Sequence, residues 1–352
     1  MEADIRQAFE NAYEIKTSKI FQNKDGYILD CSGRQYVLSS SKEPIQKAIY
    51  TYAAQQHLWE KRFTKSDRFL LTAEGVPFTL INGIYFTAAP YMTGKECNID
   101  RYDDLAEAAA MLAEMHAAAR GFTKSRAVSL MRPGIQRAAA DALLPQSILA
   151  VPAENWVRTE IGQTINTFYR RTEELKRFRR IARRNKNRFD YAYLSVADYY
   201  CGMAEDIYHA LLASPYQRLA AQFAQEGCLC HCDYTGHNIV HTNRGTFLTG
   251  FENCCIELPV YDISNFLRRR MRKCGWSIPD AQYILDHYNA VRAISDDEYQ
   301  VLKLLIQFPQ KLWRIVNKYY NSKRAWCEKN CLEKLEEIQC EREPLADFIA
   351  GL

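Results

Sequence analysis

The chain has 352 residues, of which 47% are hydrophobic and 25% are charged, and its net charge at pH 7 is +4. These proportions are typical of folded globular proteins and exclude extensive disorder. The length is more natural for two lobes than for one core, since a domain usually takes roughly 100 to 200 residues. Met1–Asp4 does not begin a recognisable signal peptide, and no apolar run approaches the roughly 18 residues of a membrane-spanning helix. We therefore expect a cytoplasmic protein with no membrane partner.

The first 92 residues predict a small antiparallel sheet with one helix. Alternating apolar residues predict strands at 17–21, 27–30 and 34–38, with turns at 23–26 and 32–33, and later strands at 69–72, 78–81 and 85–88. Between these two groups, Ile45–Trp59 has the spacing of a helix with one apolar side. This order is typical of a kinase-like small lobe, which we expect to end at residue 92. Ala89 and Tyr91 would then lie in a hinge whose backbone groups meet an adenine ring if a nucleotide binds.

Residues 93–352 predict a larger and mainly helical lobe that contains one hairpin. Leu105–Arg120 is rich in alanine and ends at Gly121, a residue that commonly closes a helix. Ser295 begins another helix, with acidic residues in its first turn. We interpret His116 as a core or capping residue. A closing surface helix is expected within residues 324–340.

The hairpin at residues 228–253 carries the most informative motif of the chain. Its loop, from His231 to Asn238, has the pattern H-x-D-x-x-x-x-N that is found in kinase catalytic loops. In such loops the Asp orients the attacking hydroxyl and the Asn holds Mg²⁺, so Asp233 and Asn238 are the candidate base and metal ligand. The pattern predicts a strand at 228–230 before the loop, and strands at 239–240 and 246–249 after it.

A second Asp follows the hairpin. Leu258–Arg269 places Asp262 at the opening of an apolar helix. With these segments the chain resembles the spore coat protein S family of endospore-forming bacteria, whose members are similar to aminoglycoside and choline phosphotransferases. Further segments that match are 75–85, 105–121 and, most distinctively, 308–321.

The resemblance implies an α+β, bilobal, protein-kinase-like fold of the aminoglycoside phosphotransferase type, with a small antiparallel-sheet lobe and a larger, mainly helical lobe. It also implies that His231 and Asp262 support the catalytic loop. ATP and Mg²⁺ are the expected cofactors if the site is active, and none is expected with certainty. The resemblance further implies a place in the spore coat after synthesis in the mother cell. Other spore coat proteins are then expected partners, and a small molecule or nucleotide is the expected ligand between the lobes.

Four positions depart from the family pattern. Ser39 stands where a phosphate-binding Lys is expected, at the end of the strand that contains residues 34–38. Gln55 and Gln56 stand where the Glu partner of that Lys is expected, and a neutral amide cannot complete an ion pair. Gly250 replaces the Asp that would hold the metal. Because losing one preorganised charged group commonly costs on the order of 10² to 10³ in rate, these changes predict little turnover.

Two functional hypotheses follow from the motif and its departures. The first is an inactive, kinase-like spore coat protein (a pseudokinase) that acts as a binding or scaffold module in coat assembly. The alternative is an active small-molecule phosphotransferase that uses ATP and an alcohol group as acceptor, with Asp233 as base and with Asn238 and Glu252 on Mg²⁺. Lys42, three residues after Ser39, is the candidate to replace the missing Lys.

A basic segment offers a third function. Ten of the nineteen residues from Arg170 to Arg188 are Lys or Arg, with aromatic residues interleaved. Such a segment can bind a polyanion or nucleic acid, because basic residues release counterions from it. It is equally typical of the solvated face of a helix, and we favour that interpretation, so nucleic acid is not an expected partner.

The twelve cysteines are too sparse for a disulfide scaffold, and we interpret them as thiols. A metal site is the less favoured alternative for the group near the catalytic loop, since no C-x-x-C pair is present. This group contains Cys228, Cys230, His231, Cys232, Cys254 and Cys255. Cys327 and Cys331 lie one helical turn apart, and we hypothesise that they oxidise in a mature coat.

Overall fold

The computed structural model describes residues 2–23, 26–40, 43–185, 187–321 and 328–352. Contacts divide the chain into two compact units. The sheet unit comprises Met1–Thr159 and Phe223–Asp262, and the helical unit comprises Glu160–Gln222 and Ile263–Leu352. The sequence-based lobe boundary at residue 92 differs from this division and stays a prediction.

The sheet unit contains a five-stranded antiparallel sheet in the order β1-β2-β3-β5-β4. Its strands are β1 (Lys19–Asn23), β2 (Gly26–Cys31), β3 (Arg34–Ser40), β4 (Thr79–Ile81) and β5 (Ile84–Pro90). Helix α2 (Ile45–Glu60) follows β3, as the sequence predicts. The antiparallel small lobe that the sequence predicts is therefore confirmed.

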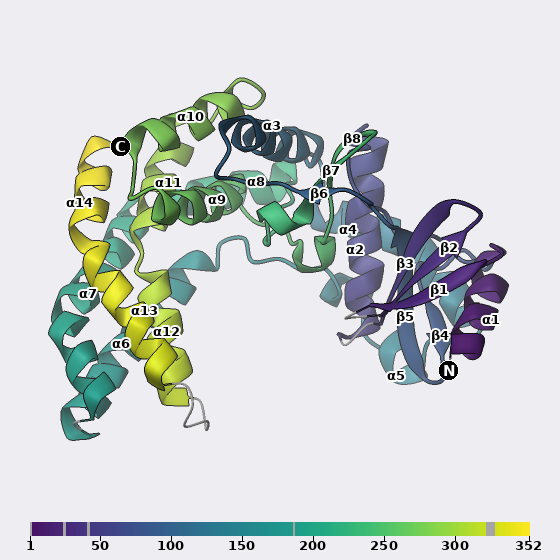
Figure 1. Cartoon of the computed structure of the whole chain (residues 1–352), viewed down its shortest axis with the longest axis horizontal. Helices are drawn as coiled ribbons and strands as arrows, with labels where there is room; N and C mark the ends of the chain where they lie inside the picture. The colour runs from purple at the N-terminus through teal and green to yellow at the C-terminus, as the bar shows by residue number, and fades with distance from the viewer. Residues whose placement is uncertain (1, 24–25, 41–42, 186, 322–327) are drawn as a thin grey trace. The chain divides into compact units, whose positions relative to one another are not determined.

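Helix α1 (Glu2–Tyr13), which the sequence analysis did not predict, packs on one face of this sheet (Figure 1). Its buried residues Ile5, Phe9 and Tyr13 are spaced by four, so they share one side of the helix. They pack in one core with Leu29 and Leu38 of the sheet. The spacing of four was a readable signal in the sequence.

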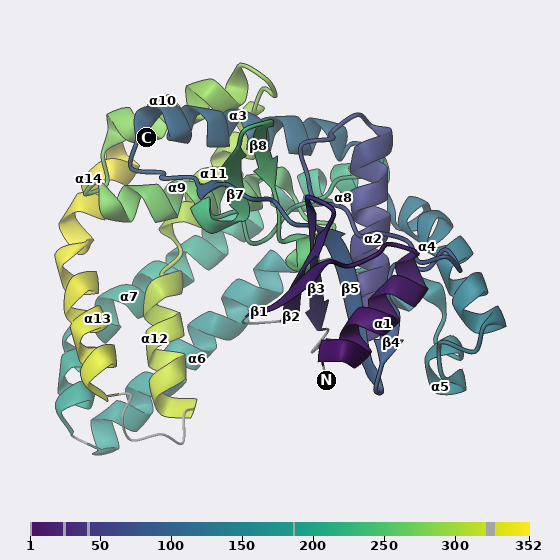
Figure 2. The same cartoon turned by 45° about the vertical axis from the view of Figure 1, so that its right-hand side comes forward.

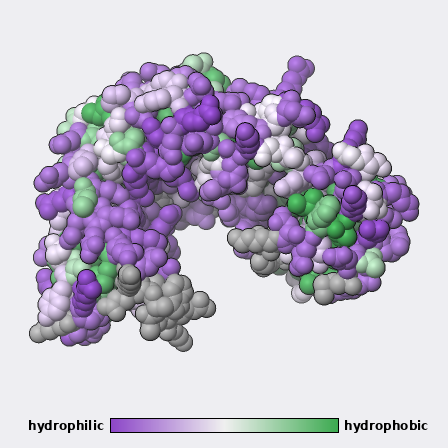
Figure 3. Space-filling model, in the orientation of Figure 1, coloured by the Kyte–Doolittle hydropathy of each residue, from purple (hydrophilic) through white to green (hydrophobic). Residues whose placement is uncertain are grey.

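The opposite face of the sheet carries a row of apolar residues across four strands. Phe21 pairs with Ile28, Ile28 with Val37, and Val37 with Ala89. Because paired residues of antiparallel strands point to the same face, these four side chains form one continuous apolar strip. Hydrophobic surface over this part of the sheet is visible in Figure 3.

The strand expected at residues 69–72 is wrong. Leu70 donates its N–H to the carbonyl of Ala88, but its neighbours are not in the ladder. The Phe69 N–H donates to the side chain of Gln55, and the Thr72 N–H donates to the Val76 carbonyl in a turn. A side chain and a local turn therefore take the donors that a strand would need.

The rest of the sheet unit contains a second, three-stranded sheet in the order β6-β7-β8. Strands β7 (Ile239–Thr242) and β8 (Gly245–Leu248) confirm the hairpin after the catalytic-loop motif, and β6 (Lys95–Glu96) pairs with β7. The strand expected at 228–230 is reduced to a bridge between Cys230 and Cys255. The other elements are α3 (Tyr102–Ala118), α4 (Lys124–Ala140), α5 (Gln146–Leu149), η1 (Ala153–Asn155), η2 (Gly236–Asn238) and η3 (Phe251–Asn253).

The helical unit is built around a long antiparallel pair, α6 (Thr164–Asn185) and α7 (Arg188–Ala213). Helix α12 (Gln310–Asn321) packs along α6, and α13 (Glu328–Cys340) packs along α7 and α12 (Figures 1 and 2). Helices α10 (Ile278–Asn289), α11 (Asp296–Gln307) and α14 (Arg342–Gly351) complete the unit, while α8 (Tyr216–Glu226) and α9 (Pro259–Lys273) each span the division. Ser295 caps α11 as predicted.

Among the described residues, no helix has both the length and the apolar character needed to cross a bilayer.

The basic segment lies mainly on α6, which buries Phe168, Leu175 and Phe178 along one side. Part of its charge is paired within the helical unit, since Lys176 bridges to Glu205 at 2.9 Å. Further basic side chains are exposed, at positions 170, 177, 180 and 184. This arrangement is that of a solvated helix face, and binding of a polyanion to it stays a prediction.

Candidate active site

Asp262 is the centre of the catalytic-loop region. Its carboxylate is fully buried and accepts the backbone N–H groups of His231 at 2.6 Å and Cys232 at 2.9 Å. The ring Nε2 of His116 lies 3.3 Å from the same carboxylate. Asp262 therefore anchors the start of the loop. His116 is a buried core residue in contact with it, as the sequence analysis expected.

The His231 side chain ties the loop to the strand that follows it. Its Nδ1 accepts the Asp233 N–H at 3.3 Å, so the proton lies on Nε2, which donates to the Thr249 carbonyl at 2.9 Å. Burial lowers the pKa of His231, because the interior penalises the imidazolium. The neutral ring is thus a structural link with both nitrogens hydrogen-bonded.

Asp233 and Asn238, the candidate base and metal ligand, lie next to each other. The Asn238 amide donates to the Asp233 carbonyl at 2.9 Å and to the Asp233 carboxylate at 3.4 Å. An Asn that served as a metal ligand would offer its oxygen to the ion. Here the amide nitrogen makes both bonds to Asp233 and ties the loop together, while the Oδ1 oxygen is the atom that faces Gly250.

Gly250 stands where the metal-binding Asp is expected, and the Asn238 side chain fills the space in front of it. Gly250 has the left-handed backbone angle φ +81. A Cβ placed there would lie 2.8 Å from the Asn238 Oδ1, closer than real Cβ contacts. The position is therefore doubly suited to glycine, by its backbone angle and by its neighbour.

Replacement of Gly250 by Ala should lower the free energy of unfolding by more than the roughly 1–2 kcal/mol that a left-handed residue with a side chain usually costs. The matched control is Gly83→Ala, because Gly83 has φ +79 but nothing within 4 Å of its added Cβ. Urea unfolding of both variants measures the difference. Equal losses would mean that the Asn238 side chain does not occupy the vacated position.

Asp67 is a site residue that the sequence analysis missed. Its carboxylate accepts the Gln55 amide at 3.1 Å on one oxygen and the Gly250 N–H at 3.3 Å on the other. Desolvation, and then the charge of Glu252, raises the pKa of Asp67 to about 7. A carboxyl group thus contacts the backbone of Gly250. It belongs to the loop after α2 and not to residue 250 itself. Nothing in the local sequence indicates this, since the contact joins residues 183 positions apart.

The residues of the small lobe that depart from the family pattern differ in burial. Gln55 is fully buried and bridges Asp67 and the Phe69 backbone. Gln56 is partly exposed and donates to Glu60 on the same helix. Ser39 is the last residue but one of β3 and lies opposite Thr87, on the face that carries the apolar row. Lys42, the proposed replacement cation, lies outside the described residues.

Glu252, the proposed replacement metal ligand, is exposed on the short helix η3. Its carbonyl oxygen accepts the Arg158 guanidinium at 2.7 Å, which fixes the backbone of this helix. In the described part of the chain, Glu252, Asp67 and Asp233 belong to no group of three possible ligands within 4.8 Å. Magnesium binding by Asn238 and Glu252 stays a prediction.

The hinge residues Ala89 and Tyr91 extend the ladder between β3 and β5. Ala89 pairs with Val37, and the Tyr91 N–H donates to the Gln35 carbonyl at 2.9 Å. The Tyr91 donor is thus already engaged within the sheet. Contact of these backbone groups with an adenine ring stays a prediction.

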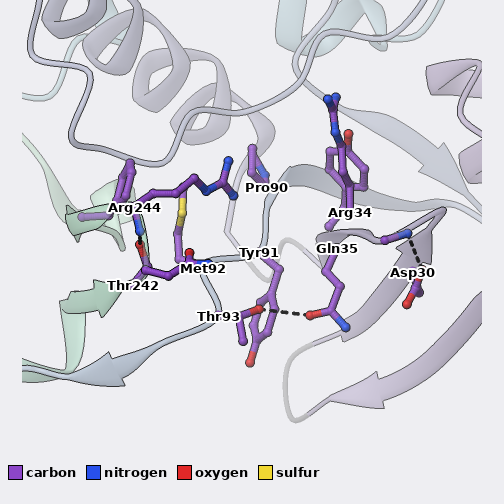
Figure 4. Close-up of a pocket in the computed structure, with 13 residues that line it drawn as sticks. Asp30, Arg34, Gln35, Pro90, Tyr91, Met92, Thr93, Thr242 and Arg244 are labelled. Atoms are coloured by element: carbon purple, nitrogen blue, oxygen red, sulfur yellow. Dashed lines mark hydrogen bonds between the residues drawn. The ribbon is translucent and has the colours of Figure 1, made fainter.

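A pocket of about 510 Å³ lies beside this hinge (Figure 4). Its lining comes from the turn between β2 and β3, from Pro90–Thr93, and from the turn between β7 and β8. Thr93 donates to Gln35 at 3.1 Å along one wall, and Arg34 and Arg244 bring positive charge to the lining. Asp30 adds one carboxylate to these two guanidinium groups, so the pocket is a polar recess at the hinge with a net cationic lining.

The cysteines around the loop do not form the metal group that was considered for them. In the described ranges, the possible ligand group that contains Cys230 is completed by His116 and Asp262 and by none of the other cysteines. The Asp262 carboxylate already accepts two backbone N–H groups there. Cys232 and Cys255 lie 3.2 Å apart, sulfur to sulfur. Of the pair proposed to oxidise in the coat, Cys327 lies outside the described residues.

Comparison with known proteins agrees with this fold. Residues 70–294 match the phosphotransferase enzyme family (APH). Spore coat protein S of Bacillus subtilis (strain 168) is 24% identical over 166 residues, which cover 47% of this chain and 47% of that protein. The match thus spans about half the length of that relative.

Solved structures show the same fold. An aminoglycoside phosphotransferase from Alicyclobacillus acidocaldarius has a TM-score of 0.80 at 21% identity, covering 98% of this chain and 94% of that chain. An amicoumacin kinase, solved with AMP-PNP and Ca²⁺, has a TM-score of 0.55 at 12% identity, covering 97% of this chain and 93% of that chain. The predicted kinase-like fold is confirmed. Because the family match covers more than half of its residues, the chain belongs to the phosphotransferase enzyme family.

Proposed function

We propose that this protein is a spore coat component that keeps the phosphotransferase fold as a binding or scaffold module and does not transfer phosphate. The observation that carries the proposal is Gly250, which supplies no metal-binding side chain and has no room for one, since an added Cβ would lie 2.8 Å from the Asn238 Oδ1. Phosphoryl transfer depends on positioning and on neutralising charge with a metal and a Lys. At Ser39 and Gly250 the chain lacks both groups.

A place in the coat is supported by the similarity to spore coat protein S, which covers half of that relative. Two surfaces of the sheet unit indicate what the module binds. The apolar row Phe21, Ile28, Val37 and Ala89 offers an apolar face, and residues of the same sheet line part of the cationic recess at the hinge. A flat, uncharged or anionic small molecule, or a coat protein segment, suits these surfaces without a metal.

The thermal midpoint of the full chain, measured with ATP in the presence and absence of Mg²⁺, tests the proposal. A ligand that binds the folded state alone stabilises it by RT ln(1 + [L]/Kd). We expect no magnesium-dependent shift, because the metal ligands are missing. A shift of several degrees that requires Mg²⁺ would instead favour the alternative, an active phosphotransferase.

ATP hydrolysis by the natural chain and by a Ser39→Lys, Gly250→Asp double variant gives an independent readout. Activity gained by the double variant alone supports a lapsed site, whereas hydrolysis by the natural chain contradicts the proposal. Coat association is tested separately, by probing extracts of purified spores for the chain. Its absence from the coat fraction would overturn the proposed location and leave the enzymatic conclusion standing.

A further inference from the structure

We propose that Cys97, Asp104 and His241 form a binding site for a zinc-like divalent transition metal, separate from the catalytic-loop region. One possible ligand atom from each residue lies within 4.8 Å of the other two. The three residues come from three places in the sheet unit: just after β6, the first turn of α3, and β7. None of them belongs to the loop motif or to its departures.

The ring of His241 is oriented as a metal ligand would be. Its Nδ1 lies 2.9 Å from the Thr246 hydroxyl and 3.4 Å from the Glu107 carboxylate. Its Nε2 faces Asp104 at 3.4 Å and, in the part of the chain that the structure describes, is a buried nitrogen without a hydrogen bond. Metal-binding histidines commonly donate one ring nitrogen to a hydroxyl or carboxylate and offer the other to the ion. In His241, Nδ1 is the nitrogen beside a hydroxyl and a carboxylate, and Nε2 is the nitrogen left for the ion.

Hydrogen bonds also hold the other two candidate ligands, Asp104 and Cys97, in place. The Asp104 carboxylate accepts the Asn98 N–H at 2.9 Å, which holds it toward His241. Cys97 is buried, and its backbone N–H donates to the Ile239 carbonyl at 2.8 Å, so its place next to β7 is set by the backbone. The supporting contacts are therefore present around all three candidate ligands.

The chemistry of the donors selects the ion. A thiolate, an imidazole and one carboxylate suit Zn²⁺, whereas Mg²⁺ and Ca²⁺ prefer sites made of oxygen alone. The side chains of His241 and Asp104 are 26% and 18% exposed, so an ion can enter and keep a water as fourth ligand. On binding, the sulfur of Cys97 forms the bond to zinc and releases its proton to solvent. The ion would pin the segment after the hinge to α3 and to the β7–β8 hairpin.

Metal analysis of the full chain tests the site, after stripping with a chelator and reloading with Zn²⁺. We expect about one zinc per chain and a thermal midpoint several degrees higher with zinc than with chelator. Cys97→Ser and His241→Gln should lose both effects. His237→Gln and Cys340→Ser, which change an exposed histidine and an exposed cysteine outside the group, should keep them.

Co²⁺ binding supplies a spectroscopic readout of ligation by sulfur. Cobalt bound through sulfur shows a thiolate charge-transfer band, which we expect in the natural chain and not in Cys97→Ser. The competing explanation is a His241 ring that pairs with Asp104 and Glu107 with no metal. Absence of the band, or zinc content equal in the natural chain and His241→Gln, would overturn the proposal.

Discussion

Replacement of Asp262 by Ala is expected to lower the free energy of unfolding by about 3–5 kcal/mol, because it strips the partner from buried polar groups. The backbone donors of His231, which is fully buried, and of Cys232, which is partly buried, would be left unpaired. Each unsatisfied buried donor costs about 1–3 kcal/mol. Urea unfolding measures the loss, and hydrogen exchange over residues 228–240 should show that protection of the loop amides is lost.

The matched control is Asp233→Ala, which removes a carboxylate from the same loop. Asp233 is half-buried, and its carboxylate accepts the Asn238 amide at a long 3.4 Å. We expect this variant to lose about 1 kcal/mol or less, although Asp233 is the nominal catalytic residue. Equal losses for the two variants would refute the view that Asp262 is the structural centre of the loop.

The stability of the protein should fall as the pH rises from about 4 to about 7, through the titration of Asp67. The pKa of Asp67 is raised to about 7 in the folded chain, above the ordinary value of 3.8, chiefly by burial. Within this window the folded state holds a proton that the unfolded state has released, so raising the pH favours unfolding. In Asp67→Asn this contribution is absent. The difference in unfolding free energy between natural chain and variant should therefore change by an amount on the order of a few kcal/mol between pH 4 and pH 8.

The change of this difference with pH isolates the titration of Asp67. The cost of placing an amide beside Gly250 is the same at every pH and therefore cancels. Glu252→Gln provides the mechanistic control, because the charge of Glu252 is the second cause of the raised pKa. This variant should show a weaker pH dependence than the natural chain over the same range. Parallel pH profiles for the natural chain and Asp67→Asn would show that Asp67 does not titrate in this window.

Much of the fold could be predicted because its signals are local. Strands β1, β2 and β3 alternate apolar residues, and Gly121 and Ser295 mark helix boundaries by their own chemistry. Helix α1 was missed although its apolar spacing was visible, and residues 69–72 were misassigned as a strand. The second error has a tertiary cause, since the Gln55 side chain takes a donor that a strand would have used.

The candidate site divides in the same way. The sequence by itself determined the loop from His231 to Asn238, its support Asp262, and the missing groups at Ser39 and Gly250, because spacing and residue type suffice for these. Only the tertiary structure decided that Asn238 fills the vacated position and that Gln55, rather than Gln56, faces inward. The physical reason is that these features depend on side-chain direction between segments far apart in the chain, which residue spacing does not encode. The same holds for Asp67, whose raised pKa exists only because folding buries it against a distant glycine.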